Sequence, residues 1–482
     1  MLQSAAMHAR LLDRLALLVP LAAGALVYAN ALGNSFVLDD YHFILENPVV
    51  RGEAPLGFLE VTTTPGGHFY RPLGLLSYRL DYLLAGPSPH WLHLASVLYH
   101  LLAVLLVVLL GRALLGRGAA LVAGLLFAVH PVHVEAVTAL ANRTEVLATI
   151  GYLGAILAWL RLPRRGAGPA VLLCGLLALL CKESALTLPL ALLLVDWLRP
   201  GGRLRPASLL WTLPAVAIYY GLRTLAFQDV GFTAYPDWFA GRPLGERVFG
   251  ILDLLGRYAR LLVVPTELCA DWAPPRVPPV TEPTLGVVVG LLIGIGSALG
   301  FVQLARRRAP AALGLGLGLT GLVLYLHVIP LGVLMAERFL YLPSAGFALL
   351  AGSAAASLAR RVARPWLVPA LVGGVALAFG ALTVDRNVDW ENPLILWSVT
   401  AAHPQASALS HGNLGLAWFW AGKPDLARAS LERAVQLEPG RQSFRHSLAL
   451  LCREAGASPE EVRAVEEGRA RTCLTRPPGP GR

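Results

Sequence analysis

Apolar runs of about 20 residues recur along most of this chain, and arginines gather at their ends. One helix needs about 20 apolar residues to cross the hydrocarbon core of a bilayer. Hydrophobic residues make up 56% of the chain and charged residues only 15%, whereas soluble proteins average about 25% charged residues. The sequence therefore predicts an all-α bundle that spans a membrane many times.

The net charge of +10 follows the same pattern. The excess arginines lie beside apolar runs, as they do in the cytoplasmic loops of membrane proteins. A nucleic-acid-binding domain would instead concentrate basic residues on one face of a polar domain. We expect no nucleic-acid partner.

About eleven spans are expected, because every second connection between apolar runs carries arginines. The predicted spans are 11–33, 91–112, 118–135, 143–161, 168–184, 185–198, 207–224, 284–305, 310–331, 340–358 and 366–383. This alternation places the amino terminus inside and the tail outside. The first run resembles a signal peptide, but it continues to Leu32, so we interpret it as an uncleaved helix.

One amphipathic segment, 245–265, would break the alternation if it crossed the membrane. It carries five charged residues, and each would cost about 2.5–3.5 kcal/mol at the centre of a lipid-facing helix. We therefore expect an interfacial helix on the outer surface. The membrane domain then covers 1–383, with an outer loop at 34–90.

The tail, 384–482, is polar and shows the spacing of a tetratricopeptide repeat. Small and apolar residues fall at the packing positions of such a repeat of about 34 residues: Leu414, Gly415, Trp418, Ala427, Leu431, Ala434 and Pro439. The five cysteines are scattered and form no metal-binding pattern. Cys452 and Cys473 would pair only if the tail faced an oxidising compartment.

Two adjacent aspartates, Asp39 and Asp40, follow the first span in "FVLDDYHFILENP". They could form a solvated loop, bind a metal ion or act as a base. A prenyl-synthase-type metal motif would need a third carboxylate, but Phe43 and Ile44 occupy those positions. Apolar neighbours and the position at the membrane boundary also disfavour a solvated loop, so a base at the lipid–water boundary is the preferred interpretation.

Further charged residues gather on the predicted outer face. Arg71 lies in the first outer loop, Glu135, Arg143 and Glu145 surround the next outer turn, and Lys182, Glu183, Glu337, Arg338 and Tyr341 lie in or beside apolar runs. Ionisable residues within membrane spans are functional candidates, although structural ion pairs explain some of them. Because adjacent residues on a helix do not face each other, Lys182 and Glu183 each need their own partner. A zinc site at His130, His133 and Glu135 is disfavoured, since Pro131 breaks the helix there.

These motifs resemble those of the transmembrane and tetratricopeptide-repeat protein O-mannosyltransferases and their bacterial relatives, in the GT-C glycosyltransferase superfamily. The matching blocks occur in order along nearly the whole chain: "FVLDDYHFILENP", "YRPLGLLSYRLDY", "HWLHLASVLYHLL", "FAVHPVHVEAV", "NRTEVLA", "CKESALTLP" and "AERFLYLPSAGFALL", followed by the repeat. The tail departs from the family, whose members usually carry many repeats, and this departure bears on recognition of a protein acceptor.

The resemblance implies an enzyme that moves a sugar, mannose above all, from a dolichyl- or polyprenyl-phosphate donor to an acceptor hydroxyl with inversion. It implies that Asp39 or Asp40 is the base and that Arg338 is the first candidate for the donor phosphate. The remaining expected substrate-binding residues are Arg71, Arg143, Lys182, Glu135, Glu145, Glu183, Glu337 and Tyr341.

No metal ligand is assigned, and a divalent ion beside the acidic loop stays open. The expected partners are a lipid-linked sugar donor, a protein or glycan acceptor, membrane lipid and a protein bound at the repeat. The expected location is a bacterial inner membrane, or the endoplasmic reticulum in a eukaryote, with the active site and the tail extracytoplasmic. The alternative is a non-enzymatic membrane scaffold that docks partners through the repeat.

Overall fold

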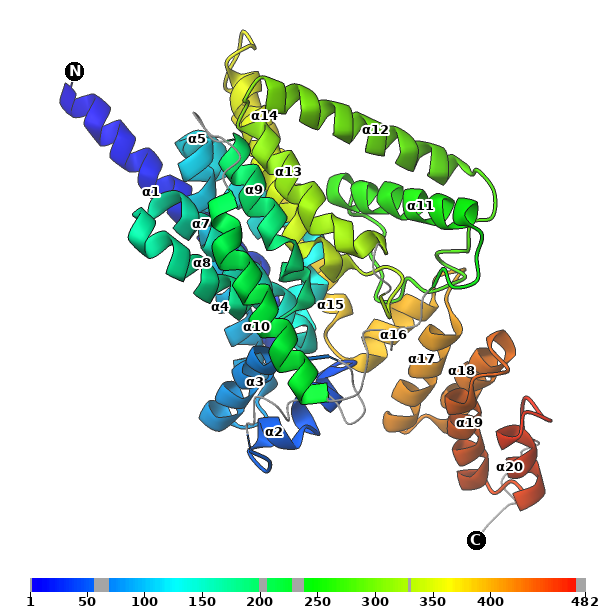
Figure 1. The fold of residues 1–482 in the computed structure, drawn as a ribbon. Coiled ribbons are helices and arrows are strands. Elements are labelled where there is room, and N and C mark those ends of the chain that lie inside the picture. Colours follow the sequence, from blue (N-terminus) through cyan, green and yellow to red (C-terminus); the bar gives the residue numbers. More distant parts are fainter. Residues whose placement is uncertain (1, 56–68, 199–205, 228–237, 328–330, 474–482) are drawn as a thin grey trace. The chain divides into compact units, whose positions relative to one another are not determined.

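The computed structural model describes residues 2–55, 69–198, 206–227, 238–327 and 331–473, and every regular element in these ranges is a helix (Figure 1). The chain divides into two compact units. The first contains Met1–Leu268 and Val280–Val388, and the second contains Cys269–Pro279 and Asp389–Arg482.

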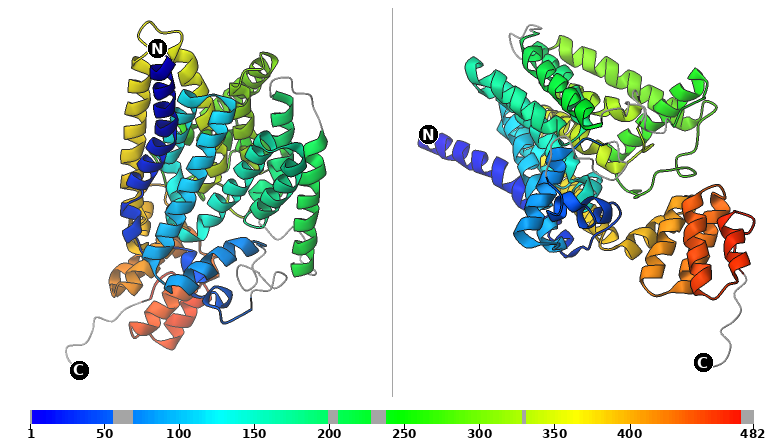
Figure 2. Two further views of the ribbon diagram at one scale, coloured as in Figure 1. Left: turned by 90° about the vertical axis from the view of Figure 1, so that its left-hand side faces the viewer. Right: turned by 60° about the horizontal axis from the view of Figure 1, so that its bottom comes forward.

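The first unit is a bundle of long apolar helices. Its helices are α1 (Leu2–Val27), α2 (Pro48–Arg51), α3 (Pro72–Ala85), α4 (Pro89–Leu114), α5 (Arg117–Ala128), α6 (Val134–Thr138), α7 (Arg143–Arg161), α8 (Arg164–Leu179), α9 (Leu188–Leu198), α10 (Leu209–Phe227), α11 (Leu244–Val263), α12 (Leu285–Arg306), α13 (Ala311–Leu322), α14 (Tyr341–Ala359) and α15 (Leu367–Asp389). Figure 2 shows α1 beside α15, where the side chain of Asn387 donates a hydrogen bond to the carbonyl of Val27 (2.8 Å).

The chain is a multi-pass membrane protein. Five helices in the described ranges are long and apolar enough to cross a bilayer: α4, α10, α12, α15 and the helix Glu337–Ala359 that includes α14. A sixth span results if the pair Arg117–Ala128 and Pro131–Thr138, bent by 53°, is counted as one. The other expected spans coincide with shorter apolar helices or with helices that carry more charge, including α7, α8 and α9.

Extended residues precede three short 3₁₀ turns in the apolar part of the chain. His130 and Lys182 are extended, as is Ala336, and each precedes a short 3₁₀ turn: Pro131–His133, Glu183–Thr187 and Glu337–Leu340. Pro131 explains the first break, because a proline disfavours the helical conformation of the preceding residue. Irregular backbone at membrane depth is tolerated where it is buried in protein or lines a cavity. These turns and the residues just before them hold four of the charged residues that the sequence analysis selected: Lys182, Glu183, Glu337 and Arg338.

Close glycine contacts fix α14 against α13. A Cβ atom at Gly346 would lie 2.2 Å from the backbone nitrogen of Gly318 and 2.6 Å from the carbonyl oxygen of Gly314. Small residues allow two membrane helices to approach at backbone distance. This contact positions the chain that leads into α14, including Arg338.

The loop between α1 and α4, which the sequence analysis predicted to be outer, is packed against the first unit. Phe36, Ile44, Val50, Leu75, Tyr78, Leu92 and Leu140 form one apolar cluster. This cluster holds the aspartate pair against the helical bundle. Part of the loop, 56–68, lies outside the described residues.

The second unit is built from α16 (Pro393–Ala401), α17 (Ala408–Trp420), α18 (Pro424–Leu437), α19 (Gln442–Glu454) and α20 (Pro459–Glu466). Gly415 of α17 lies against Ala427 and Leu431 of α18, and both of these are fully buried. Cys452 and Cys473 form a disulfide with a Cα–Cα distance of 6.0 Å. The carboxyl-terminal part of the second unit begins at Asp389, whereas the sequence analysis placed the start of the tail at residue 384. The difference arises because α15 continues to Asp389.

The second unit also contains Cys269–Pro279, which the sequence analysis placed in the membrane domain. Within the unit, the carboxylate of Asp271 accepts hydrogen bonds from the hydroxyls of Ser407 and Ser410, the latter at 2.7 Å. Ser407 in turn caps the amino terminus of α17 by accepting from the backbone N–H of Ser410. The connection between α11 and α12 is therefore part of the core of this unit.

Candidate active site

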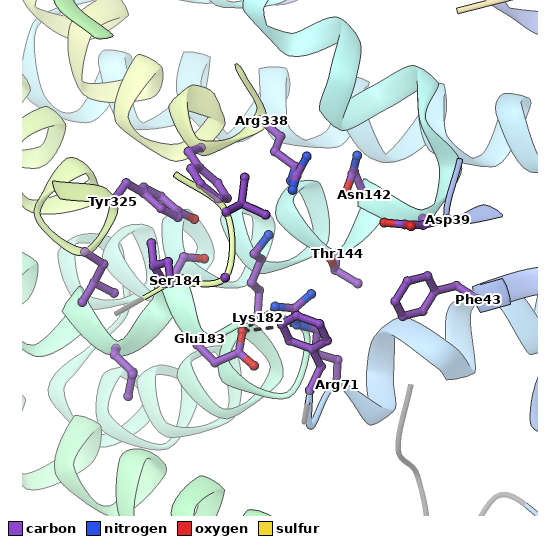
Figure 3. A pocket seen from close by; sticks show the side chains of 18 of the residues that line it. Asp39, Phe43, Arg71, Asn142, Thr144, Lys182, Glu183, Ser184, Tyr325 and Arg338 are labelled. Carbon is purple, nitrogen blue, oxygen red and sulfur yellow. Dashed lines mark hydrogen bonds and ion pairs between the residues drawn. The ribbon is translucent and has the colours of Figure 1, made fainter. Parts of the chain in front are cut away.

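A cavity of about 430 Å³ is lined by residues of the loop after α1, of α3, of the turn before α7, of the segment after α8 and of the segment before α14 (Figure 3). Its charged lining residues are Asp39, Arg71, Lys182, Glu183 and Arg338, and its walls include aromatic residues. These residues come from four separate parts of the sequence. The cavity therefore joins one of the predicted bases to three of the predicted cations.

The two adjacent aspartates lie in different environments. Asp39 lines the cavity and is partly exposed. Asp40 is fully buried, and its two carboxylate oxygens accept hydrogen bonds from the backbone N–H groups of Val37 (3.0 Å) and Ala141 (2.6 Å). Burial raises the pKa of Asp40 to about 7, although these hydrogen bonds lower it in part. Asp40 thus joins the acidic loop to the turn before α7, and Asp39 faces the cavity.

The backbone beside Asp39 is unusual. Leu38 has a φ of 51°, in the left-handed region that branched and bulky residues rarely adopt. Such residues persist where the surrounding structure fixes them, and they gather at functional sites. Here the conformation directs the two following carboxylates to different places.

Arg338 lies at the top of the cavity in Figure 3. It is held by Glu135. One carboxylate oxygen of Glu135 pairs with the guanidinium of Arg338, and the other accepts from the backbone N–H of Arg338 (2.9 Å). The side chain of Glu135 is 2% exposed and that of Arg338 is 19% exposed. Since Glu135 does not line the cavity, the arginine presents its remaining donors toward the cavity with the carboxylate behind it.

Lys182 and Glu183 have separate partners, as their adjacency predicted. The Nζ atom of Lys182 lies 2.5 Å from Glu145, whose carboxylate also accepts a hydrogen bond from the hydroxyl of Tyr325 (3.1 Å). Glu183 accepts two hydrogen bonds from Arg71, at 2.8 and 3.2 Å. Each cation of the cavity is therefore paired with one glutamate.

Six predicted site residues are not part of the cavity lining: Asp40, Glu135 and Glu145, described above, and Arg143, Glu337 and Tyr341. Arg143 is fully buried and bonds to Asp81 (2.5 Å), the hydroxyl of Ser96 (3.0 Å) and the carbonyl of Leu92 (2.8 Å). Glu337 pairs with Arg386 at 3.3 Å, and the hydroxyl of Tyr341 lies 2.8 Å from Nδ1 of His100. These contacts hold helices together and leave no face of these side chains toward the cavity.

No group of three or more metal-ligating side chains occurs in the ranges that the structure describes. Nε2 of His130 lies 3.0 Å from the carbonyl of Leu262, and Nε2 of His133 lies 2.7 Å from the hydroxyl of Ser344. The disfavoured zinc interpretation of these histidines finds no support in this geometry.

Several lining residues were not selected from the sequence. Asn142 and Thr144 flank Arg143, Ser184 follows Glu183, and Tyr325 stacks on Phe339 with ring centroids 4.3 Å apart. A tyrosine in an apolar run needs a partner for its hydroxyl, and this signal could have identified Tyr325. Asn142 lies near Asp39 in Figure 3.

Known proteins share these segments. Residues 72–225 match the sequence profile of the dolichyl-phosphate-mannose-protein mannosyltransferase family. Protein O-mannosyl-transferase Tmtc1 of Drosophila melanogaster is 30% identical over 87% of this chain. The chain is a distant homologue of the protein O-mannosyltransferases. The resemblance expected from the motifs is thereby confirmed.

Two further known proteins are similar to most of this chain. Protein O-mannosyl-transferase TMTC3 of Mus musculus is 28% identical over 81% of this chain. The chain spans 61% of the fly relative and 48% of the mouse relative. The solved oligosaccharyltransferase of Archaeoglobus fulgidus, tethered to an acceptor peptide, aligns with 77% of this chain and 55% of its own, at 16% identity and a TM-score of 0.42.

Proposed function

We propose that this chain transfers a hexose, mannose above all, from a dolichyl- or polyprenyl-phosphate donor to an acceptor hydroxyl, with inversion. The observation that carries the proposal is the single cavity that contains a partly exposed carboxylate and three cations. The homology to protein O-mannosyltransferases supports the same donor class.

Asp39 is the proposed base. In the reaction, the acceptor oxygen forms a bond to the anomeric carbon from the face opposite the phosphate, and the carbon–oxygen bond to the phosphate breaks. The bonding electrons leave with the lipid phosphate, and the hydroxyl proton moves to Asp39. One positioned carboxylate suffices, because no covalent sugar–enzyme intermediate forms. Asp40 is excluded from this role in the proposal, since its oxygens already accept backbone hydrogen bonds.

The cations stabilise the phosphate as its charge grows. Arg338 is the first candidate, because a guanidinium offers paired donors to phosphate oxygens. Lys182 and Arg71 line the same cavity and complete the set. Their glutamate partners fix the cations before substrate binds, which is how a preorganised site lowers an electrostatic barrier. In this proposal Arg143, Glu337 and Tyr341 support the fold.

The site is proposed to face the extracytoplasmic side, with the tail on the same side and all of the expected spans crossing the membrane. The Cys452–Cys473 disulfide supports this orientation, since disulfides persist in oxidising compartments. The helix α11 matches the expected interfacial segment and would guide the lipid tail. The close α17–α18 pair supports a tetratricopeptide-type tail that binds a protein acceptor or partner. A bacterial inner membrane is the proposed location.

The test uses membranes that contain the full chain and a radiolabelled polyprenyl-phosphate mannose donor. Asp39→Asn should lower transfer at least a hundredfold, within the range of general base catalysis, while donor binding is retained. Glu46→Gln is the matched control, because Glu46 is an exposed carboxylate of the same loop, paired with His42. Full transfer by Asp39→Asn would refute the assignment of the base, and absence of transfer by the unaltered chain with any lipid-phosphate sugar would refute the proposed activity.

A further inference from the structure

A second hollow lies between α5, α14 and α15. It has a volume of about 580 Å³. Ten of its twelve lining residues are alanine, valine or leucine, including Ala354, Leu358 and Leu371, and the other two are Ser357 and Arg361. We name this hollow the α14–α15 groove. Water gains few hydrogen bonds in such a site, so an apolar chain is the better occupant.

The groove is separate from the proposed active site. The helix α14 begins at Tyr341, shortly after the cavity-lining residues Arg338 and Phe339 in the sequence. The groove-lining residues of α14 start only at Ala351. A helix rises about 1.5 Å per residue. Measured along the helix axis from Tyr341, the groove therefore begins at about 15 Å and Arg361 lies at about 30 Å. A donor whose phosphate lies at Arg338 would therefore place its charge far from Arg361.

One end of the groove carries a concentration of positive charge. Arg361 lines the groove, and Arg360 and Arg364 lie within three residues of it. All three are exposed, and no hydrogen bond or ion pair of their side chains occurs among the described residues. The chain contains no aspartate or glutamate from Tyr341 to Val384. The positive charge at this end is thus not neutralised by α14, α15 or their connection.

Trp366 marks the depth of this charged end. It is 62% exposed and lies two residues after Arg364. Exposed tryptophans of membrane proteins gather at the level of the lipid headgroups. The groove therefore runs from the headgroup level, where the arginines lie, into the hydrocarbon layer.

We propose that the α14–α15 groove binds one anionic phospholipid of the surrounding membrane. An acyl chain fills the apolar hollow beside Ala354 and Ala355, and the phosphate of the headgroup pairs with Arg361. Basic pockets between membrane helices recognise anionic headgroups by this combination of charge and an apolar wall. A zwitterionic lipid with the same acyl chains would gain the apolar contact without net charge complementarity.

The test is native mass spectrometry of the full chain, exchanged into mixtures of phosphatidylglycerol and phosphatidylcholine with identical acyl chains. One phosphatidylglycerol molecule should stay bound after the other lipids dissociate. Arg361→Gln should lower its retention at least tenfold. Arg307→Gln is the matched control, because Arg307 is an exposed arginine that follows α12, away from the groove. It should keep the lipid.

A second variant tests the apolar part. Ala354→Leu narrows the groove and should reduce retention while Arg361 is unchanged. Thermal unfolding of each variant in the same detergent confirms that the protein is folded. Equal retention of the two lipids, or unchanged retention in both Arg361→Gln and Ala354→Leu, would overturn the proposal.

Discussion

At the scale of single residues, neighbours in the sequence have different chemical roles. Asp39 faces a cavity and Asp40 is tied to two backbone amides. Lys182 and Glu183 likewise bind Glu145 and Arg71 and not each other. The chemistry of this protein therefore depends on which way each of two adjacent side chains points.

Asp40 should make stability depend on pH. Its pKa in the folded protein is about 7, against an ordinary value of 3.8, so between these values the folded state keeps a proton that the unfolded state releases. The stabilisation is complete below about pH 4 and is lost as the pH rises through 7. The unfolding temperature should fall over this range in the unaltered protein and fall less in Asp40→Asn, measured by thermal unfolding in detergent. An equal decline in both proteins would show that another group is responsible.

Arg143 should be needed for folding and not for chemistry. Arg143→Ala leaves Asp81 buried without its cation, which costs about 3–5 kcal/mol, so the unfolding temperature should drop sharply. Arg51→Ala, which removes an exposed pair with Glu53, should change stability by about 1 kcal/mol or less. Adding Asp81→Asn to Arg143→Ala should restore part of the loss. A stable Arg143→Ala protein without transfer activity would instead assign Arg143 to the active site.

At the scale of elements, helix breaks and close helix contacts place the site. The 3₁₀ turns after Lys182 and Ala336 lie beside apolar helices, and Lys182, Glu183 and Arg338 meet in one cavity. The glycine contact of α13 with α14 fixes one side of that arrangement.

Gly346→Ala tests the helix contact. Its added methyl group would meet the backbone of α13 at Gly318 and Gly314, which cannot rotate away as a side chain can. Overpacking of this kind costs about 1–3 kcal/mol, and transfer should decline with it because Arg338 lies just before α14. Gly373→Ala in α15 is the control, since its methyl group would contact nothing within 4 Å. Equal unfolding temperatures for the two variants would contradict the proposed role of the contact.

At the scale of the whole molecule, the orientation in the membrane can be tested through the tail. If the tail is extracytoplasmic, Cys452 and Cys473 should be disulfide-bonded in cells and should not react with a membrane-impermeant maleimide. Cys452→Ser frees Cys473, which should then be labelled from outside intact cells. Cys181, buried in the first unit, should not be labelled. Labelling that requires permeabilised cells would reverse the proposed orientation.

Helices were easier to predict from the sequence than the ion pairs between them. Run lengths located the five described helices that are long enough to cross a membrane, and the motifs contained Asp39, Arg71, Lys182, Glu183 and Arg338, which line the cavity. The ion pairs could not be read from spacing, because Glu135 and Arg338 are 203 residues apart and Arg71 and Glu183 are 112 apart. Arg143 carried the same signal as the cations of the cavity, a charge beside an apolar run, although it lies outside the cavity lining and pairs with Asp81. Periodicity also could not reveal that residues 269–279 belong to the second unit.

The passage of residues 269–279 through the second unit means that the tail is not a removable appendage. The chain enters that unit twice, once between α11 and α12 and again after α15. In a protein shortened at residue 388, Asp271 would lose both serine hydroxyls that donate hydrogen bonds to it. Loss of activity after such a deletion would therefore have two explanations. Residues 269–279 would lack their packing partners, and the part of the chain proposed to recognise the acceptor would be missing. Exchange of tails between relatives should carry residues 269–279 along with the helices α16 to α20.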